Sequence, residues 1–362
     1  MNDLVIPKIK KNRVLSNLSR GNFYLSNTHF SNYRFKNIKI YNSLCECIKF
    51  EKCTFENVEF VDCELNEVSF IDCTFDHINF LNLVVMEIDF NESRINNVFG
   101  KRGFFEESQL NKVELNNLNI EESSLFNTSL VNSLLQKSNF FQNDIKHSSI
   151  VESKLLRLRY ENNSFKTRIV ANSECNQNSF SSGEAEDFVS FDCKLNEFIL
   201  EGLNINRISF HRSDINNLRL YKLNLNCANF VEAKIDNSKH EYVVLNNSQL
   251  TDAQIYHSTY YHCVFNIASF NRAVVKNTDF SKSEFYQTDY RGASLTSSSL
   301  AKTKQSNIKT HGTKLDFTDR TLASNDPLLG TIEKWYYKHN VGPRDKNLEF
   351  PVFPSGVSRY GI

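Results

Sequence analysis

The chain has 362 residues, 40% of them hydrophobic, and its 42 Lys and Arg residues balance 42 Asp and Glu residues. Because the net charge is zero, no overall field draws nucleic acid or an anionic membrane to the chain, and we expect no direct nucleic-acid partner. No apolar run approaches the twenty or so residues of a membrane span, and Met1 to Ser16 lacks the apolar core of a secretory signal.

Residues 1–20 precede the regular pattern and are expected to form an N-terminal cap. Val14 and Leu15 favour an edge strand, and Pro7 with its basic neighbours would stop another chain from pairing with the open end. A basic arm that contacts phosphate or an acidic protein is the alternative.

From residue 21 to residue 317 an apolar residue recurs every five positions. Between Leu25 and Leu300, nearly all positions divisible by five hold Leu, Ile, Phe, Val, Tyr or Cys, and we call these positions the anchor column. Two residues before each anchor lies a second column of small or β-branched residues, such as Val58 and Ala268. The pattern alternates like a strand but restarts every five residues, which fits neither a helix nor a long strand. It predicts short extended pieces joined by tight corners, and hence a solenoid. The exceptions in the anchor column are Gly100, Ala185, Ser190 and His240.

The repeat resembles the pentapeptide-repeat family, whose consensus is a small residue, Asp or Asn, Leu or Phe, and two variable residues. The resemblance covers about three quarters of the chain, although the first half has Ile, Val or Leu where the family prefers Ala. It implies an all-β solenoid, specifically a right-handed quadrilateral β-helix with twenty-residue coils stacked about 4.8 Å apart. The closest matches are Ala228-Asn229-Phe230, Thr278-Asp279-Phe280, Thr288-Asp289-Tyr290 and Ala293-Ser294-Leu295.

Many of the expected corners carry Asn, which tolerates the left-handed backbone and bonds to its own turn. Gly100 and Gly103 fall on inward positions of adjoining units, which predicts a local bulge or a kink in the rod. The Asn corners of the first half are Asn27, Asn32, Asn37, Asn42 and Asn57.

A second irregularity in the repeat is the segment from Ser181 to Ser190, in which small residues stand at inward positions and break the apolar pattern. Because the register resumes at Phe191 without an offset, the segment predicts an outward loop of whole repeat length. Its acidic residues Glu184, Glu186 and Asp187 form a candidate contact site on a rigid rod. A solvated loop without a role is the alternative.

Positions twenty apart share a wall of the coil, so the register also sorts the outward residues. One wall carries apolar outward residues in four successive coils, and such a stripe usually marks an interface. We therefore predict that the stripe and the acidic cluster bind a partner; the alternative is that the acidic loop folds back over the stripe. Smaller candidates lie around Val84 and Phe104, and around Tyr242 and Tyr261. The stripe consists of Val131, Val151, Ile169, Val189 and Phe191.

Nothing in the sequence indicates a catalytic or metal site. Five of the nine Cys occupy the second column, where a thiol fills the space of Ala or Ser. The spacing of Cys53 and Cys73 permits a disulfide, but free buried thiols are favoured. There is no Cys-x-x-Cys pair and no phosphate-binding loop, and His257 and His262 fit polar turn residues better than a metal site. We expect no cofactor, no metal and no enzymatic activity.

Residues 318–362 are expected to cap the last coil. Asp326 and Pro327 predict the start of an amphipathic helix that runs to about Asn340, followed by an irregular tail. The order of repeat array and helix is also similar to SopA-like bacterial effector ubiquitin ligases, in which a HECT-like catalytic lobe follows. That lobe uses a Cys beyond the helix, whereas the last Cys here is Cys263. This resemblance therefore implies only the substrate-binding part of such a ligase.

Three functions follow from these patterns. The favoured one is a non-catalytic scaffold that binds a protein partner, as a bacterial effector delivered to a host cell or as a homodimer. The second is a DNA mimic that binds a type II topoisomerase, as the family resemblance implies, and the lack of net charge counts against it. The third is the ligase fragment. The expected location is the cytoplasm, or a host cell reached without a cleavable signal peptide.

Overall fold

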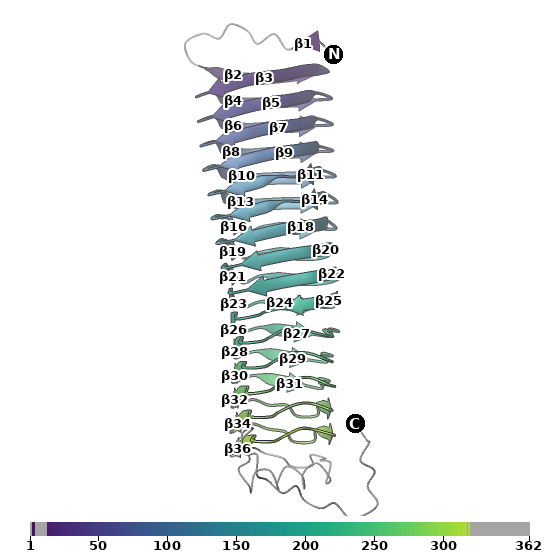
Figure 1. Cartoon of the computed structure of the whole chain (residues 1–362). Coiled ribbons are helices and arrows are strands. Elements are labelled where there is room, and N and C mark those ends of the chain that lie inside the picture. The colour runs from purple at the N-terminus through teal and green to yellow at the C-terminus, as the bar shows by residue number, and fades with distance from the viewer. Residues whose placement is uncertain (1, 4–12, 317, 319–362) are drawn as a thin grey trace, which may run out of the picture.

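The computed structural model describes residues 2–3, 13–316 and 318, which form a rod of stacked parallel strands (Figure 1). Each strand pairs with strands twenty residues away, as in the register of Phe35 with Phe55 and of Phe55 with Phe75. About 15 such coils lie between Val14 and Asp316. The pairing confirms the predicted all-β solenoid of twenty-residue coils.

Long strands that pass through corners occur before residue 210, together with short ones, whereas all described strands after it have three residues. The long strands are β2 (Val14–Gly21), β3 (Phe23–Ser31), β4 (Arg34–Tyr41), β5 (Leu44–Glu51), β6 (Thr54–Val61), β7 (Glu64–Ile71), β8 (Thr74–Leu81), β9 (Val84–Asn91), β10 (Arg94–Lys101), β13 (Glu114–Glu121), β18 (Asp144–Val151), β20 (Arg159–Ala171), β22 (Ser179–Phe191) and β25 (Asn204–Ser209). The short strands are β1 (Asn2–Asp3), β11 (Phe104–Glu106), β12 (Gln109–Asn111), β14 (Ser124–Phe126), β15 (Ser129–Val131), β16 (Leu134–Gln136), β17 (Asn139–Phe141), β19 (Lys154–Leu156), β21 (Glu174–Asn176), β23 (Lys194–Asn196), β24 (Ile199–Glu201), β26 (Asp214–Asn216), β27 (Arg219–Tyr221), β28 (Lys234–Asp236), β29 (Lys239–Glu241), β30 (Gln254–Tyr256), β31 (Thr259–Tyr261), β32 (Val274–Lys276), β33 (Glu284–Tyr286), β34 (Ser294–Thr296), β35 (Lys304–Ser306) and β36 (Lys314–Asp316).

The N-terminal edge of the stack is β2, which pairs with β4 in the same register as the later coils. It contains the edge strand expected within residues 1–20, and β1 pairs with β3. No helix occurs in the part of the chain that the structure describes, so none there could cross a membrane. The capping helix predicted from Asp326 to about Asn340, and the tail after it, lie outside the described residues.

A left-handed backbone residue stands at every fifth position from Asn17 to Gly312, which gives each coil four corners. The predicted Asn corners all have positive φ, and their side chains form ladders along the rod: Asn57 Nδ2 donates to Asn37 Oδ1 at 2.9 Å, and Asn37 Nδ2 to Asn17 Oδ1 at 3.0 Å. Most other residue types resist this conformation by about 1–2 kcal/mol. The square cross-section and the right-handed sense of the coil stay predictions.

Anchor side chains fill the interior of the rod and stack from coil to coil. Phe30, Phe50, Phe70 and Phe90 form one ladder of nearly parallel rings, with centroids 4.9 to 5.0 Å apart. A ladder of this kind adds about 0.5–1.5 kcal/mol per ring pair to the burial of the rings themselves. The first coils of the rod are therefore held together by aromatic stacking as well as by strand pairing.

The prediction of a bulge at Gly100 and Gly103 is wrong. β10 runs through Gly100 without an offset and pairs it with Phe80 on one side and Ile120 on the other. A side chain at Gly103 would collide with the ring of Phe105, because an added Cβ would lie 2.6 Å from its Cε2. Neighbouring side chains thus occupy the space beside the two glycines, and the backbone continues without a bulge.

The outward loop predicted from Ser181 to Ser190 is also absent. This segment belongs to β22, which pairs along its length with β20 on one side and with β25 on the other. Ala185 and Ser190 point inward and are buried, and the space that they leave is taken by the ring of Phe188 from the second column, 5.4 Å from that of Phe180. The coil therefore conserves its volume by exchanging large and small residues between the two columns.

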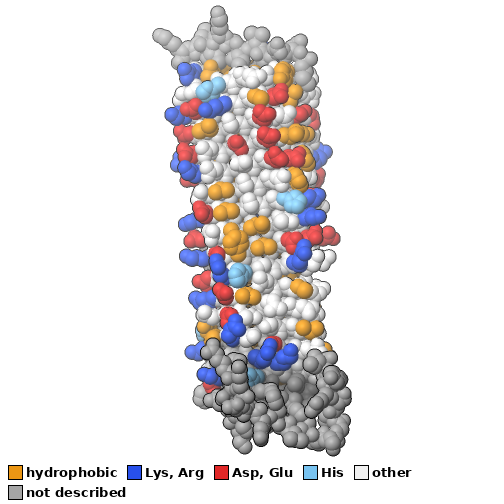
Figure 2. All heavy atoms as spheres, viewed as in Figure 1, with side chains coloured by type: hydrophobic (Ala, Val, Ile, Leu, Met, Phe, Trp, Pro, Cys, Tyr) orange, Lys and Arg blue, Asp and Glu red, His pale blue; other side chains and the backbone are white. Residues whose placement is uncertain are grey.

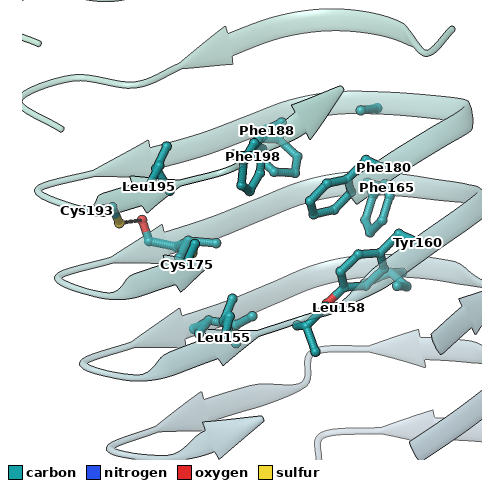
Figure 3. Close-up of a cluster of buried hydrophobic side chains, with 14 of the residues drawn as sticks. Leu155, Leu158, Tyr160, Phe165, Cys175, Phe180, Phe188, Cys193, Leu195 and Phe198 are labelled. Carbon is teal, nitrogen blue, oxygen red and sulfur yellow. Dashed lines mark hydrogen bonds between the residues drawn. The ribbon is translucent and has the colours of Figure 1, made fainter. Parts of the chain in front are cut away.

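All nine cysteines are free thiols, and most lie in the core. Each thiol of the second column points at backbone carbonyls; Cys193 Sγ, for example, donates to the oxygen of Val170 at 3.3 Å (Figure 3). Burial raises the pKa of Cys45, Cys175 and Cys263 to about 12, which leaves these thiols protonated and unreactive at neutral pH.

Candidate functional site

The stripe residues lie in two neighbouring rows on one wall. In the first row Val131 pairs with Val151, Val151 with Ala171, and Ala171 with Phe191. In the second row Ile169 pairs with Val189. Strands pair about 4.8 Å apart, so the side chains of each row touch their neighbours in the next coil. The register thus brings all five predicted stripe residues together.

The stripe is accessible but shallow. Ile169 is exposed, whereas Val131, Val151, Val189 and Phe191 are half-buried against one another. The rows end in polar residues, because Asn111 precedes Val131 and Ser209 follows Val189 in the strand register. Figure 2 shows one face of the rod, with apolar side chains gathered in groups along its middle and charged ones along its edges.

The acidic cluster does not cover the stripe. Glu184 and Glu186 lie on β22 before the left-handed corner at Asp187, and the stripe residues Val189 and Phe191 lie after it. The cluster therefore occupies the adjoining wall. Since its backbone is paired on both sides, it cannot fold back, which excludes that alternative.

Basic residues of neighbouring coils neutralise much of the acidic cluster. Arg207 Nε lies 2.6 Å from an oxygen of Asp187, and Lys166 Nζ lies 3.8 Å from one of Glu186. At the other border of the stripe Arg212 pairs with Asp192 at 2.5 Å, and this hydrogen bond lowers the pKa of the Asp192 carboxyl. The stripe is thus bordered by ion pairs, which resembles the polar rim of a protein interface.

The two smaller candidates are also present on the surface. Val84 and Phe104 are exposed and paired in register, with Met86 beside them. Near the C-terminal end, the rings of Tyr242 and Tyr261 lie edge to face with centroids 6.2 Å apart. The sequence analysis missed the further members of this second group, Tyr221 and the amines of Lys222 and Lys282, which stack on or bond to the tyrosines.

A buried arginine was missed entirely. Arg168 occupies the second column, where small residues are the rule, and only 2% of its surface is exposed. Its guanidinium carbon lies 4.6 Å from the ring centre of Tyr160 and 5.2 Å from those of Phe165 and Phe180, with Phe188 at 5.6 Å. Figure 3 shows these four rings on one side of the interior, from β20 and β22. Its position could have predicted its burial, because the five-residue register places residue 168 in an inward column.

The guanidinium of Arg168 is only partly satisfied. Nη2 donates to the hydroxyl oxygen of Tyr160 at 3.1 Å, while Nη1 has no hydrogen-bond partner among the described residues. No carboxylate in the described part of the chain pairs with it. The surrounding rings offset some of the cost of the buried charge through cation–π attraction.

The described residues hold no group of three side chains that could bind a metal ion. His257, which was weighed as a metal ligand, instead has its Nδ1 2.9 Å from Asp236 Oδ1 and its Nε2 3.2 Å from the amide of Asn277. These contacts tie three corners together along the rod, as expected of a polar turn residue.

The repeat of five residues and the coil of twenty define the fold as a parallel β-solenoid built from five-residue units. No model of a known family matches the sequence, and the search of characterised proteins gave no match.

Solved structures give similar folds. HetL, a pentapeptide repeat protein involved in the regulation of heterocyst differentiation in the cyanobacterium Nostoc, is 20% identical, covers 60% of this chain and 89% of its own length, and has a TM-score of 0.40. QnrB1, a plasmid-mediated fluoroquinolone resistance protein, is 15% identical over 54% of this chain and 96% of its own, with a TM-score of 0.22. The periplasmic alginate epimerase AlgG is 6% identical, covering 85% of this chain and 84% of its own, with a TM-score of 0.30. At these values the likeness concerns the fold alone.

Proposed function

We propose that the chain is a non-catalytic scaffold that binds a protein partner through the apolar stripe. The observation that carries the proposal is the alignment of Val131, Val151 and Phe191 with Ile169 and Val189 on paired strands. Burial of these side chains would contribute roughly 25 cal/mol per Å². The cost of ordering is small, because a stacked wall is already rigid. We also propose that the coil is right-handed and four-sided, because four sides would give the flat wall that such binding needs.

The partner must cover more than the stripe. Four coils span only about 15 Å along the rod on the strand spacing, whereas a stable interface buries about 800 Å² on each side. The partner therefore extends over the bordering ion pairs of Asp187 with Arg207 and of Asp192 with Arg212. Two copies of this chain, stripe against stripe, are the alternative occupant.

The resemblance to effector ligases supports a wider form of this proposal, in which the chain is a bacterial effector and its partner a host protein. The alternative of a DNA mimic that binds a type II topoisomerase requires a strongly acidic face. Acidic residues here pair with basic residues one coil away, as Glu56 does with Lys36 and Arg34 at 2.5 and 2.6 Å. No contact among the described residues favours the mimic.

The test is the double variant Val151→Asp with Ile169→Asp, compared with Val274→Asp, which places a carboxylate on an exposed valine outside the stripe. We expect the double variant to abolish partner capture, or to halve the mass if the chain is a homodimer, with an unchanged circular dichroism spectrum. The control should bind normally. Equal binding by all three proteins, with equal mass, would refute the stripe as the interface.

A further inference from the structure

The interior of the rod contains a cavity of about 200 Å³ between the coil of Leu65 and that of Arg168. Leu, Ile, Val and Phe side chains form most of its lining. A space of this size and chemistry is unusual in a protein interior, where packing normally leaves few voids larger than a water molecule.

The amino-acid sequence of these coils explains the cavity. The ladder of stacked rings that runs through Phe70 ends at Phe90, and the next positions of that column hold Leu110, Leu130 and Ile150. Smaller anchors thus follow the rings for three coils, and the second column beside them includes small residues such as Ser108 and Ser148.

Tyr160 and Arg168 line the C-terminal end of this cavity. Burial raises the pKa of Tyr160, so the phenol stays protonated while its oxygen accepts the bond from Arg168. The unpaired Nη1 of Arg168 leaves a cation with a free donor at the end of an apolar space. A buried donor without a partner is costly, and a buried charge normally has a counter-charge.

We propose that the cavity is a binding site for a medium-chain alkyl carboxylate, whose carboxylate pairs with Arg168 and whose tail lies among the Leu and Ile anchors. This inference goes beyond the proposed function and does not depend on it. A guanidinium prefers the planar, two-oxygen geometry of a carboxylate. The apolar remainder of the lining selects a tail without polar groups.

The size of the cavity limits the length of the ligand. A dry apolar cavity of about 150 Å³ in another protein accommodates benzene, so this one takes roughly eight to ten non-hydrogen atoms, the range from hexanoate to octanoate. Ser129 and Ser149 also line the cavity, on the paired strands β15 and β18. Both side chains are half-buried.

The experiment uses the full chain and octanoate labelled with carbon-13 at the carboxyl carbon, added both to the native protein and during refolding from urea. After removal of free ligand, we expect one bound carboxylate signal per chain and at least roughly tenfold weaker binding of 1-octanol, because the alcohol cannot form the charge-assisted bond.

Three variants sharpen the test. Arg168→Met should lose roughly tenfold or more of its affinity for octanoate and keep that for 1-octanol, whereas Lys166→Met, which removes an exposed cation from the same strand, should bind both as before. Leu110→Phe should extend the ring ladder into the cavity and exclude both ligands, which keeps the test informative if Arg168→Met fails to fold. The proposal is overturned if octanoate is not retained by either route, if wild type binds both ligands equally, or if Leu110→Phe retains octanoate.

Discussion

The coils before and after about residue 209 are built on the same repeat but turn their corners differently. In the first half the second column holds residues such as Val58 and Ile78, and strands of eight residues run through the corners. In the second half it holds mainly small residues such as Ala, Ser or Thr, and corners such as that of Ala233 close with a hydrogen bond three residues back, from Ala233 N to Phe230 O at 3.1 Å. The bond occurs only where the residue of the second column is small, but at other small residues the amide donates to the next coil instead, as Ser238 N does to Ser258 Oγ at 3.1 Å.

Packing density follows the same division. Anchors such as Leu225 and Phe265 in the second half are fully buried, whereas several anchors of the first half, among them Leu110 and Leu125, retain partial access. Small residues of the second column thus accompany both the closed corners and the tighter core.

The largest difference between the halves is expected for matched truncations of an anchor. Leu225 and Leu125 lie in the same column, five coils apart. Leu225→Ala should cost about 3–5 kcal/mol of local stability, and Leu125→Ala only about 1–2 kcal/mol, because Leu125 already borders a cavity and loses fewer contacts. Native-state hydrogen exchange of the amides in each coil measures both values. Equal losses would show that the two cores are equally tight.

Acid should weaken the second half through His240. This anchor is fully buried, neither ring nitrogen has a hydrogen-bond partner in the described structure, and burial lowers its pKa to about 3. The unfolded chain binds a proton near pH 6.5 and the folded chain does not. Stability is therefore complete above pH 6.5 and declines as the pH falls toward 3, by about 2 kcal/mol at pH 5.

The matched variant for this prediction is His240→Phe, which stacks on Tyr260 as the imidazole does. Urea titrations monitored by circular dichroism at pH 7 and pH 5 should show the extra loss in wild type alone. If the variant has the same pH dependence, surface carboxylates and not His240 cause it.

Enlarging the second column in the tight half should open a corner. Ala253→Val should cost about 2 kcal/mol through overpacking and break the bond from Ala253 N to Leu250 O, which measures 3.2 Å. Ala253→Ser should cost less than about 0.5 kcal/mol, because Ser248 and Ser258 occupy the neighbouring positions of the same column. Exchange rates of the Ala253 amide report the corner directly, and a protected amide in the valine variant would contradict the proposed role of size.

The smallest effect concerns corner residues on the surface. Ile267 has φ of 58° and is exposed, although β-branched residues are rarely left-handed. Ile267→Asn should stabilise the corner by about 1 kcal/mol. The reciprocal change Asn247→Ile, one coil earlier at the same corner, should destabilise the protein by a similar amount. Thermal melts measure both effects, and melting temperatures that shift in the same direction would contradict the argument.

Much of this fold was predictable because the place of each residue in the coil depends only on its position in the repeat and on its residue type. The period of five placed Phe75 and Leu225 inside, the chemistry of Asn37 predicted a left-handed corner, and the register put Val151 and Phe191 on one wall. Each of these inferences needs only a position and a residue type. The partner of the stripe does not follow from them, since the same pattern fits any apolar surface of matching shape.

The failures share a different cause, which is that packing depends on the sum of the side chains in a coil. Ala185 and Ser190 looked like the sign of a loop, yet Phe188 supplies the missing volume. Gly100 looked like a bulge, yet Ile120 of the next coil fills the space, 2.9 Å from where a Cβ would lie. Arg168 was passed over because a charged residue is normally read as surface, even where the register places it inside.

The orientation of the backbone hydrogen bonds also determines how the rod responds to force. All described coils are joined by bonds that run along the rod axis, as between β4 and β6, so tension applied at its two ends would load one layer at a time. Such a molecule opens by peeling, with each step releasing twenty residues, or about 70 Å of extended chain. Single-molecule extension should therefore show a series of small, evenly spaced steps, and the spacing would measure the coil length mechanically.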